Sequence, residues 1–331
     1  MSGFEENEIS LKSQGGTEIT KRSIAKQIPE ELAKEFQIIP SRVREIEEDK
    51  IRIYWQHDLA EDPEVTHLKD ESSRERFHKL VFSSHWQMND FMVKLGIPWS
   101  NKLCVIETPI EPFPIHTKSE DVINLIYFST PHRGLNLLIP AFEALATKHD
   151  NVHLNVFSSF NIYGWPEADK QYEPLFDQIR SHPKMTYHGF APQEVLREHL
   201  INSHILAYPC TWPETSCRVL MESMSAGLLC VHPNLAALSD TAGGLTGMYQ
   251  FDTDPNDHAT YFYNVLDHAV NIVNRKPMQE YLKLVKAYAD TRFNLNKISG
   301  QWEHLMKELL TKYPDVESRK IPTKKFIYKT T

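Results

Sequence analysis

The sequence predicts an α/β protein built from two Rossmann-like domains, each with its own parallel sheet. Its 331 residues are more than one domain usually holds. Short apolar runs alternate with helical patterns along most of the chain, which is typical of parallel sheets covered by helices. A proline-rich and polar stretch at 108–121 interrupts this alternation, as a linker between two domains would.

Each expected strand is a short run of apolar residues that ends in polar or turn-forming residues. In the first part of the chain the expected strands are 36–40, 51–55, 80–83 and 103–107. In the second part they are 125–129, 153–158, 185–188, 205–209, 229–232 and 248–251. Helical patterns lie between most of them, most clearly at 18–28, 137–148, 194–202 and 217–226.

These elements define the expected domains. Residues 1–115 form the first domain and residues 116–294 the second. Residues 1–14 are polar and contain no convincing strand, so a strand before 36–40 is either missing or poorly encoded. The amphipathic segment 295–314 is expected to be a helix that packs back on the first domain. The tail 315–331 is expected to be mobile and basic, either solvated or facing an anionic surface, because it carries Arg319, Lys320, Lys324, Lys325 and Lys329.

Composition excludes several classes of protein. The formal net charge of -8 argues against a nucleic-acid-binding protein with a broad basic face. Four cysteines without a C-x-x-C pair indicate reduced thiols in a cytoplasmic protein. The N-terminus resembles no signal peptide, and no apolar run has the roughly 20 residues that span a membrane, so peripheral membrane contact is the one membrane relation left open. Sixteen histidines show no convincing metal-ligand spacing, so we expect no metal site.

Two glutamates, Glu214 and Glu222, stand eight positions apart around an expected helix. Thr215 or Ser216 can cap this helix, whose first-turn N–H groups and dipole can hold a phosphate. One carboxylate then lies near whatever the phosphate carries, and the other can accept hydrogen bonds from a diol such as ribose. The alternative is an ordinary capped surface helix in which Glu222 pairs with Arg218, one turn away.

Further candidates stand where ligands bind open α/β sheets, at the carboxyl ends of strands. A glycine pair ending at Gly16 precedes a helix and permits close approach of a ligand. His57 ends one expected strand, and His85, a weaker candidate, ends another. Arg133 and Gly134 follow the first strand of the second domain, and a guanidinium can form two parallel hydrogen bonds to an anion. For each residue a structural role in a turn or in the core is the alternative.

Other common motifs for nucleotide binding, catalysis or metal binding are absent or have a simpler structural explanation. The sequence contains no G-x-G-x-x-G, Walker A, H-E-x-x-H or G-x-S-x-G pattern. Asp252 and Asp254 form a D-x-D pattern, but Pro255 and a helical pattern follow. We therefore expect a turn and a helix cap there instead of a metal site.

Taken in order from about residue 15 to 267, these features resemble the retaining glycosyltransferases of family 4, which have the GT-B fold. The E-x7-E spacing of Glu214 and Glu222 is the most specific part of the resemblance. It implies that Glu214 contacts the donor sugar and Glu222 holds the nucleotide ribose. It also implies that His57 contacts the donor sugar or its phosphate.

The resemblance also assigns the remaining donor contacts. It implies that the base lies at His188 and Gly189, mostly against backbone groups. The diphosphate and sugar would lie against Gly16, Arg133, Gly134, Thr215, Ser216, Cys217 and Arg218. Arg133 takes the place of a lysine usual in the family, and the arginine that usually follows the preceding strand is replaced by Ser129 and Thr130.

The implied activity is transfer of a hexosyl unit from a UDP or GDP sugar to an acceptor hydroxyl, with retention and without metal or other cofactor. A glycan, a lipid-linked sugar and a small molecule remain open as acceptors, and the oligomeric state is not predicted. One alternative is another enzyme on the same architecture, such as a nucleotide-sugar epimerase or a phosphorylase. The other is a catalytically inactive binding or scaffold protein.

Overall fold

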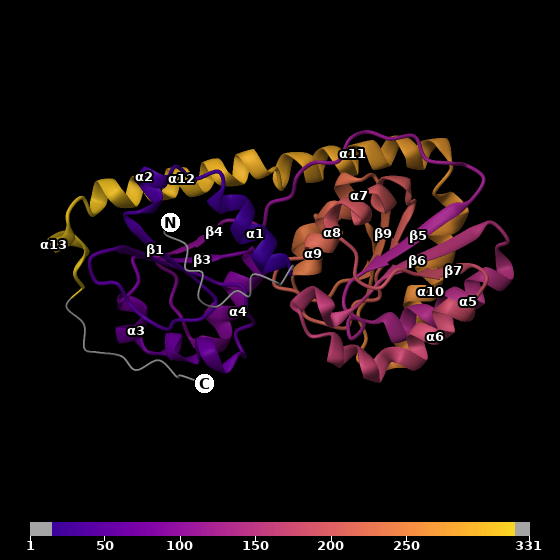
Figure 1. Cartoon of the computed structure of the whole chain (residues 1–331), viewed down its shortest axis with the longest axis horizontal. Coiled ribbons are helices and arrows are strands. Elements are labelled where there is room, and N and C mark those ends of the chain that lie inside the picture. The colour runs from indigo at the N-terminus through magenta and orange to yellow at the C-terminus, as the bar shows by residue number, and fades with distance from the viewer. Residues whose placement is uncertain (1–14, 322–331) are drawn as a thin grey trace. The chain divides into compact units, whose positions relative to one another are not determined.

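The computed structural model describes residues 15–321 and divides into two compact units (Figure 1). Unit 1 holds residues 16–109 together with the segment from Phe293 onward. Unit 2 holds the stretch 110–292, and the described residue Gly15 is grouped with it. Within both, parallel strands alternate with helices, which confirms the expected α/β class. No helix of the described residues is both long and apolar enough to cross a membrane.

The described part of unit 1 contains a parallel sheet with the order β1-β2-β3-β4. Its strands are β1 (Phe36–Pro40), β2 (Ile51–Trp55), β3 (Lys79–Phe82) and β4 (Leu103–Val105), at the positions predicted from the sequence. The segment 1–14, where a preceding strand was in doubt, lies outside the described residues. The helices are α1 (Gly16–Ala25), α2 (Glu30–Ala33), η1 (Pro63–Lys69), α3 (Glu71–Glu75), α4 (His85–Leu95), α12 (Leu295–Lys312) and α13 (Val316–Arg319).

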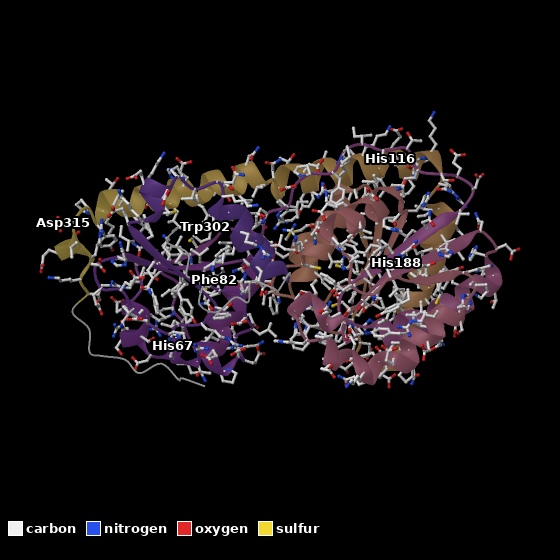
Figure 2. All side chains as sticks on the ribbon, in the orientation of Figure 1. His67, Phe82, His116, His188, Trp302 and Asp315 are labelled. Carbon is white, nitrogen blue, oxygen red and sulfur yellow. The ribbon has the colours of Figure 1, made fainter. Side chains whose placement is uncertain are left out.

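Both faces of this sheet are covered, so adjacent residues of one strand enter different clusters. Trp55 packs on Trp302 of α12, with ring centroids 4.8 Å apart. Tyr54 enters the opposite cluster, which also holds Phe82. Figure 1 shows α12 lying along the sheet, and Figure 2 labels Trp302 and Phe82. The amphipathic C-terminal helix therefore packs on the strands of unit 1, as the predicted fold requires.

Unit 2 contains a parallel sheet with the order β10-β9-β8-β5-β6-β7. The first strand of the unit, β5, lies between β6 and β8, so the strand order reverses there and creates the switch point at which Rossmann-like sheets bind ligands. The strands are β5 (Ile123–Phe128), β6 (Val152–Phe157), β7 (Met185–Tyr187), β8 (Ile205–Ala207), β9 (Leu229–Pro233) and β10 (Gly247–Tyr249). The helices are α5 (Leu135–Lys148), η2 (Phe160–Tyr163), η3 (Pro166–Tyr172), α6 (Glu173–Ser181), α7 (Gln193–Asn202), α8 (Arg218–Ser225), α9 (Ala237–Ala242), α10 (Pro255–Ile272) and α11 (Lys276–Arg292).

Two helix starts test local predictions. The Asp254 side chain accepts hydrogen bonds from the first N–H groups of α10, which confirms the expected turn and cap. At α8 the prediction of a Thr215 or Ser216 cap is wrong, because Cys217 is the N-cap residue and makes no side-chain capping hydrogen bond. Cys217 is only 1% exposed, so its thiol packs into the core as the chain enters the helix.

The linker at 108–121 is less exposed than predicted. Ile110 and Phe113 are buried, while most of the residues around them are exposed. The Phe113 N–H donates to Ser225 Oγ, and its carbonyl accepts from Lys286 Nζ. The guanidinium of Arg197 lies 3.8 Å from the centre of the Phe113 ring. These contacts fix the linker to unit 2 because an aromatic side chain in its middle needs burial.

The prediction of a free basic tail is wrong at its start. Arg319 is 4% exposed, pairs with Glu35 at 2.9 Å and donates to the Asp49 carbonyl. The buried Arg52 in turn donates to the Arg319 carbonyl. A guanidinium with several donors can satisfy carbonyl groups in the core of unit 1, and here it does so. Lys324, Lys325 and Lys329 lie outside the described residues.

Candidate functional site

At the switch point of unit 2, a glycine allows two chain segments to approach closely. Gly134 follows β5 and begins α5 with a φ of 99°. A Cβ added there would lie 1.9 Å from the backbone oxygen of Pro209, which follows β8. Only glycine allows both this φ and this approach. The turn after β5 is thereby held against the chain after β8, which leads to Glu214.

This approach brings Arg133 and Glu214 together. Arg133 Nε lies 3.3 Å from Glu214 Oε1, which also accepts a hydrogen bond of 2.8 Å from the Tyr208 hydroxyl. The two charged side chains are 21% and 13% exposed. Burial opposes the charge of Arg133, but the Glu214 carboxylate raises the pKa of Arg133 well above its ordinary value. The site therefore holds a permanent cation beside a carboxylate at the carboxyl ends of β5 and β8.

The second glutamate lies inside α8. Glu222 is 2% exposed, and its Oε1 lies 2.7 Å from Arg218 Nη2. The helix pair that sequence reasoning offered as an alternative is therefore present. Thr215 and Ser216 are partly buried and lead into the helix. Burial raises the pKa of the Cys217 thiol well above its ordinary value, so Cys217 is neutral.

The candidates for base contact follow β7. The His188 ring stacks on Phe157 with centroids 4.2 Å apart and contacts His199 at 4.6 Å. His188 Nε2 lies 2.9 Å from Asn155 Oδ1. Burial lowers the pKa of His188 to about 4, so the imidazole is neutral. Gly189 has a φ of 63° and turns the chain away from the strand.

The remaining predicted residues belong to unit 1. His57 follows β2, its ring lies 4.4 Å from that of Trp55, and burial lowers its pKa to about 3. Gly16 begins α1, and a Cβ added there would meet no heavy atom within 4 Å. His85 is exposed and is the first residue of α4. The structure therefore places His57 and Gly16 in unit 1, whereas the arginine and glutamate candidates lie in unit 2.

Two polar groups beside these candidates were not among the predicted site residues. The buried Tyr208 holds Glu214, and its position directly after β8 was the available signal. Asp58 follows His57, and burial together with the neighbouring charge of Asp62 raises its pKa to about 6. A carboxyl group with a raised pKa at the end of a parallel strand is a candidate for substrate contact.

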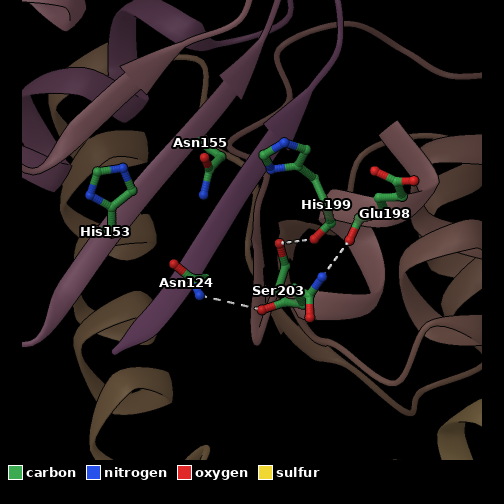
Figure 3. Close-up of a pocket in the computed structure, with 7 residues that line it drawn as sticks. Asn124, His153, Asn155, Glu198, His199 and Ser203 are labelled. Carbon is green, nitrogen blue, oxygen red and sulfur yellow. Dashed lines mark hydrogen bonds between the residues drawn. The ribbon is translucent and has the colours of Figure 1, made fainter. Parts of the chain in front are cut away.

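A polar cavity of about 350 Å³ lies elsewhere in unit 2 (Figure 3). Its lining residues include Asn124 and His153, which stand near the starts of β5 and β6, and Glu198 and His199 of α7. The cavity therefore lies toward the amino ends of these strands, whereas Arg133 follows a carboxyl end. Across residues 15–321 no cluster of three or more His, Cys, Asp or Glu side chains is arranged to hold a metal ion.

Part of the chain matches a known protein family. Residues 113–243 match the family model of glycosyl transferases group 1, a segment that includes the switch point and α8. No curated protein sequence matches the chain.

Solved structures show the same fold at low sequence identity. The chain is similar to a glycosyltransferase from Rickettsia africae, with a TM-score of 0.65, 14% identity and coverage of 88% of this chain and 81% of the other. Anabaena HepE in complex with UDP and glucose gives a TM-score of 0.60 and 15% identity, with coverage of 78% and 72%. Sucrose-phosphate synthase from Thermosynechococcus elongatus gives 0.59 and 14%, with coverage of 79% and 68%. The fold is GT-B, and the family match is confined to residues 113–243.

Proposed function

We propose that this chain is a retaining glycosyltransferase that moves a hexosyl unit from a nucleoside diphosphate sugar to an acceptor hydroxyl. The observation that carries the proposal is the Arg133–Glu214 pair at the switch point, followed directly by α8 with Glu222 inside it. Rossmann-like sheets bind nucleotides at this point. A UDP sugar is the preferred donor over a GDP sugar, since HepE, which is similar in fold, binds UDP and glucose.

Within this proposal, positive groups stabilise the leaving diphosphate. Arg133 can form two parallel hydrogen bonds to phosphate oxygens, and Arg218 stands at the first position of α8. Thr215, Ser216 and Cys217 lead into the helix N-terminus, whose N–H groups and dipole favour an anion. Charge that develops on the diphosphate as the bond to the sugar breaks is thereby stabilised.

The carboxylates orient the uncharged parts of the donor. Glu214 accepts hydrogen bonds from sugar hydroxyls while Tyr208 and Arg133 hold it in place. Glu222 accepts them from the ribose. His57 is neutral, so one of its ring nitrogens can donate to the sugar and the other can accept.

The proposed reaction needs no protein nucleophile. The bond between the anomeric carbon and the phosphate oxygen breaks through an oxocarbenium-like transition state. The acceptor oxygen bonds to the same face of that carbon, and its proton passes to the departing phosphate oxygen. Attack on this face retains the configuration. We further infer a cytoplasmic protein, because Cys104, Cys210, Cys217 and Cys230 are all unpaired thiols.

Thermal unfolding with UDP, GDP, ADP and their sugars tests donor binding. A nucleotide at 100 times its dissociation constant stabilises the protein by about 2.7 kcal/mol. Glu222→Gln, which keeps the shape of the side chain, should abolish the shift. Glu194→Ala, which changes an exposed glutamate of α7, should not. Absence of any shift in the well-folded wild type would refute the proposal. Release of the nucleoside diphosphate shows turnover, and the anomeric configuration of the product by NMR tests retention.

A binding protein without turnover is the second candidate. Both glutamates of the E-x7-E pattern are paired with arginines within the protein. These carboxylates therefore have partners without any substrate, as expected of a protein that does not catalyse transfer. A thermal shift that depends on Glu222, with no release of nucleoside diphosphate in the presence of glycan, lipid-linked or small-molecule acceptors, would favour it.

A further inference from the structure

Five aromatic side chains of unit 2 lie beside the switch point and are not used in the proposed donor site. The His132 ring stacks on Phe160 with centroids 5.2 Å apart and meets the edge of Trp212 at 5.3 Å. Tyr163 and Trp165 form a second pair at 5.5 Å. We call these five side chains the aromatic row. They come from the loops after β5, β6 and β8, so they share one edge of the sheet with Glu214.

The row is directly connected to the candidate site and partly open to solvent. Arg133 Nη1 donates to the Tyr163 hydroxyl at 3.4 Å. Trp212 stands two residues before Glu214 and is 42% exposed, and Trp165 is 63% exposed. Tryptophan is costly to expose, and a group of partly exposed aromatic rings beside a polar site marks a contact surface.

Hydrogen bonds fix the loop that presents half of the row. The Ser159 hydroxyl caps the 3₁₀ helix η2 and donates to Asp169. The Phe160 N–H donates to the other oxygen of Asp169 at 2.7 Å. Gly164 closes the turn with a φ of 76° and donates to the Asn161 carbonyl. A surface that is already ordered loses little conformational entropy when a ligand binds.

The charges on the loop that carries Tyr163 and Trp165 favour a neutral ligand over an anionic one. The same loop carries the carboxylates of Glu167 and Asp169, and its Lys170 is paired with Glu167. Arg133, which donates to Tyr163 of the row, is paired with Glu214. Burial lowers the pKa of His132 to about 4, so the row itself is neutral. A neutral ring with one apolar face and a rim of hydroxyls fits this surface, and a pyranose has that chemistry.

We propose that the aromatic row binds sugar rings of a neutral oligosaccharide, and that this oligosaccharide is the acceptor. Its rings would stack on Trp212 and Trp165 and direct one terminal hydroxyl toward Glu214. The assignment as acceptor rests on the proposed transferase function. The stacking itself does not, because the row would bind the glycan without a donor. The proposal selects a glycan over a lipid-linked or small-molecule acceptor.

Binding of maltohexaose, cellohexaose and chitohexaose to the full chain, by calorimetry and saturation-transfer NMR without nucleotide, tests this proposal. We expect at least one hexasaccharide to bind. Trp165→Ala and Trp212→Ala should each weaken it about fivefold, the value of one stacked ring. Trp165→Tyr should retain most of the affinity. Trp99→Ala, which removes a tryptophan of unit 1 that is 74% exposed, is the matched control and should change nothing.

Three outcomes would overturn the proposal. They are no binding of any of the three hexasaccharides, equal binding by wild type and both alanine variants, and row-dependent binding of phosphatidylglycerol vesicles in place of sugar. Trp165 is exposed, so its substitution leaves the fold intact, and circular dichroism checks this. Absence of a change in melting temperature with UDP would refute the donor site and leave the aromatic row untouched. The hexasaccharide experiments contain no nucleotide, so they report on the aromatic row alone.

Discussion

Arg133→Ala tests whether the switch point depends on a charge pair. The substitution removes the cation that lies 3.3 Å from Glu214 and leaves this carboxylate 13% exposed. Tyr208 still donates to Glu214, so one of its hydrogen bonds remains. In the unfolded chain both side chains are in water and do not depend on each other. The substitution therefore destabilises the folded state and lowers the free energy of unfolding.

The magnitude follows from the exposure of the pair. Breaking a buried ion pair costs about 3–5 kcal/mol, and an exposed pair contributes about 0.2–1 kcal/mol. With side chains 21% and 13% exposed, we expect Arg133→Ala to lower the free energy of unfolding by about 2–3 kcal/mol. For a unit of this size, this loss lowers the melting temperature by roughly 4–12 °C.

A double-mutant cycle in thermal unfolding isolates the charge. Glu214→Gln removes the negative charge but can still accept from Tyr208, so the double variant should recover about 1–2 kcal/mol relative to the sum of the single variants. Arg180→Ala is the matched control, because Arg180 is 44% exposed and pairs with Glu173 and Asp177 on α6. It should cost at most about 1 kcal/mol.

Two results would refute this reasoning. If Arg133→Ala lowers the melting temperature no more than Arg180→Ala, the pair is not stabilising. If the effects of Arg133→Ala and Glu214→Gln simply add, the two side chains are not coupled in solution.

Three further predictions concern the scaffold. Gly134→Ala should lower the free energy of unfolding by about 3 kcal/mol or more, because its Cβ would lie 1.9 Å from a backbone oxygen. Gly164→Ala has open space around its Cβ and should lower it by about 1 kcal/mol. Equal losses for the two variants in urea unfolding would contradict this prediction. Trp302→Ala should lower the free energy of unfolding by about 3–5 kcal/mol, because it opens a cavity between α12 and the sheet of unit 1. Trp99→Ala should lower it by less than about 0.5 kcal/mol. An unchanged unfolding midpoint for Trp302→Ala would show that α12 does not stabilise unit 1. Burial lowers the pKa of His57 from 6.5 to about 3, so the unfolded chain binds more protons between these values and the free energy of unfolding falls as pH falls from about 6.5 toward 3. His57→Asn should make that fall shallower, and an identical pH profile would show that His57 is solvated.

The strands were predictable because their signal is local. All ten expected strands occur, within a few residues of the predicted bounds. A buried parallel strand needs a short continuous apolar run such as Leu125–Phe128, whichever neighbours it later acquires. The cap of α10 was predictable for the same reason, since Asp254 bonds only to the next turn. At α8 the local rule failed because core packing of Cys217, which propensity does not include, set the start of the helix.

The sequence by itself determined the α/β class, the positions of the strands, the linker at 108–121 and the E-x7-E pattern. Tertiary structure alone decided that Gly134 closes on Pro209, that Arg133 pairs with Glu214 and that Arg319 is buried in unit 1. It also gathered Trp212, His132 and Phe160 from three separate loops into one surface. The physical reason is range. Periodicity and capping depend on a few neighbouring residues, whereas these contacts join distant segments and exist only once strand order and register are fixed.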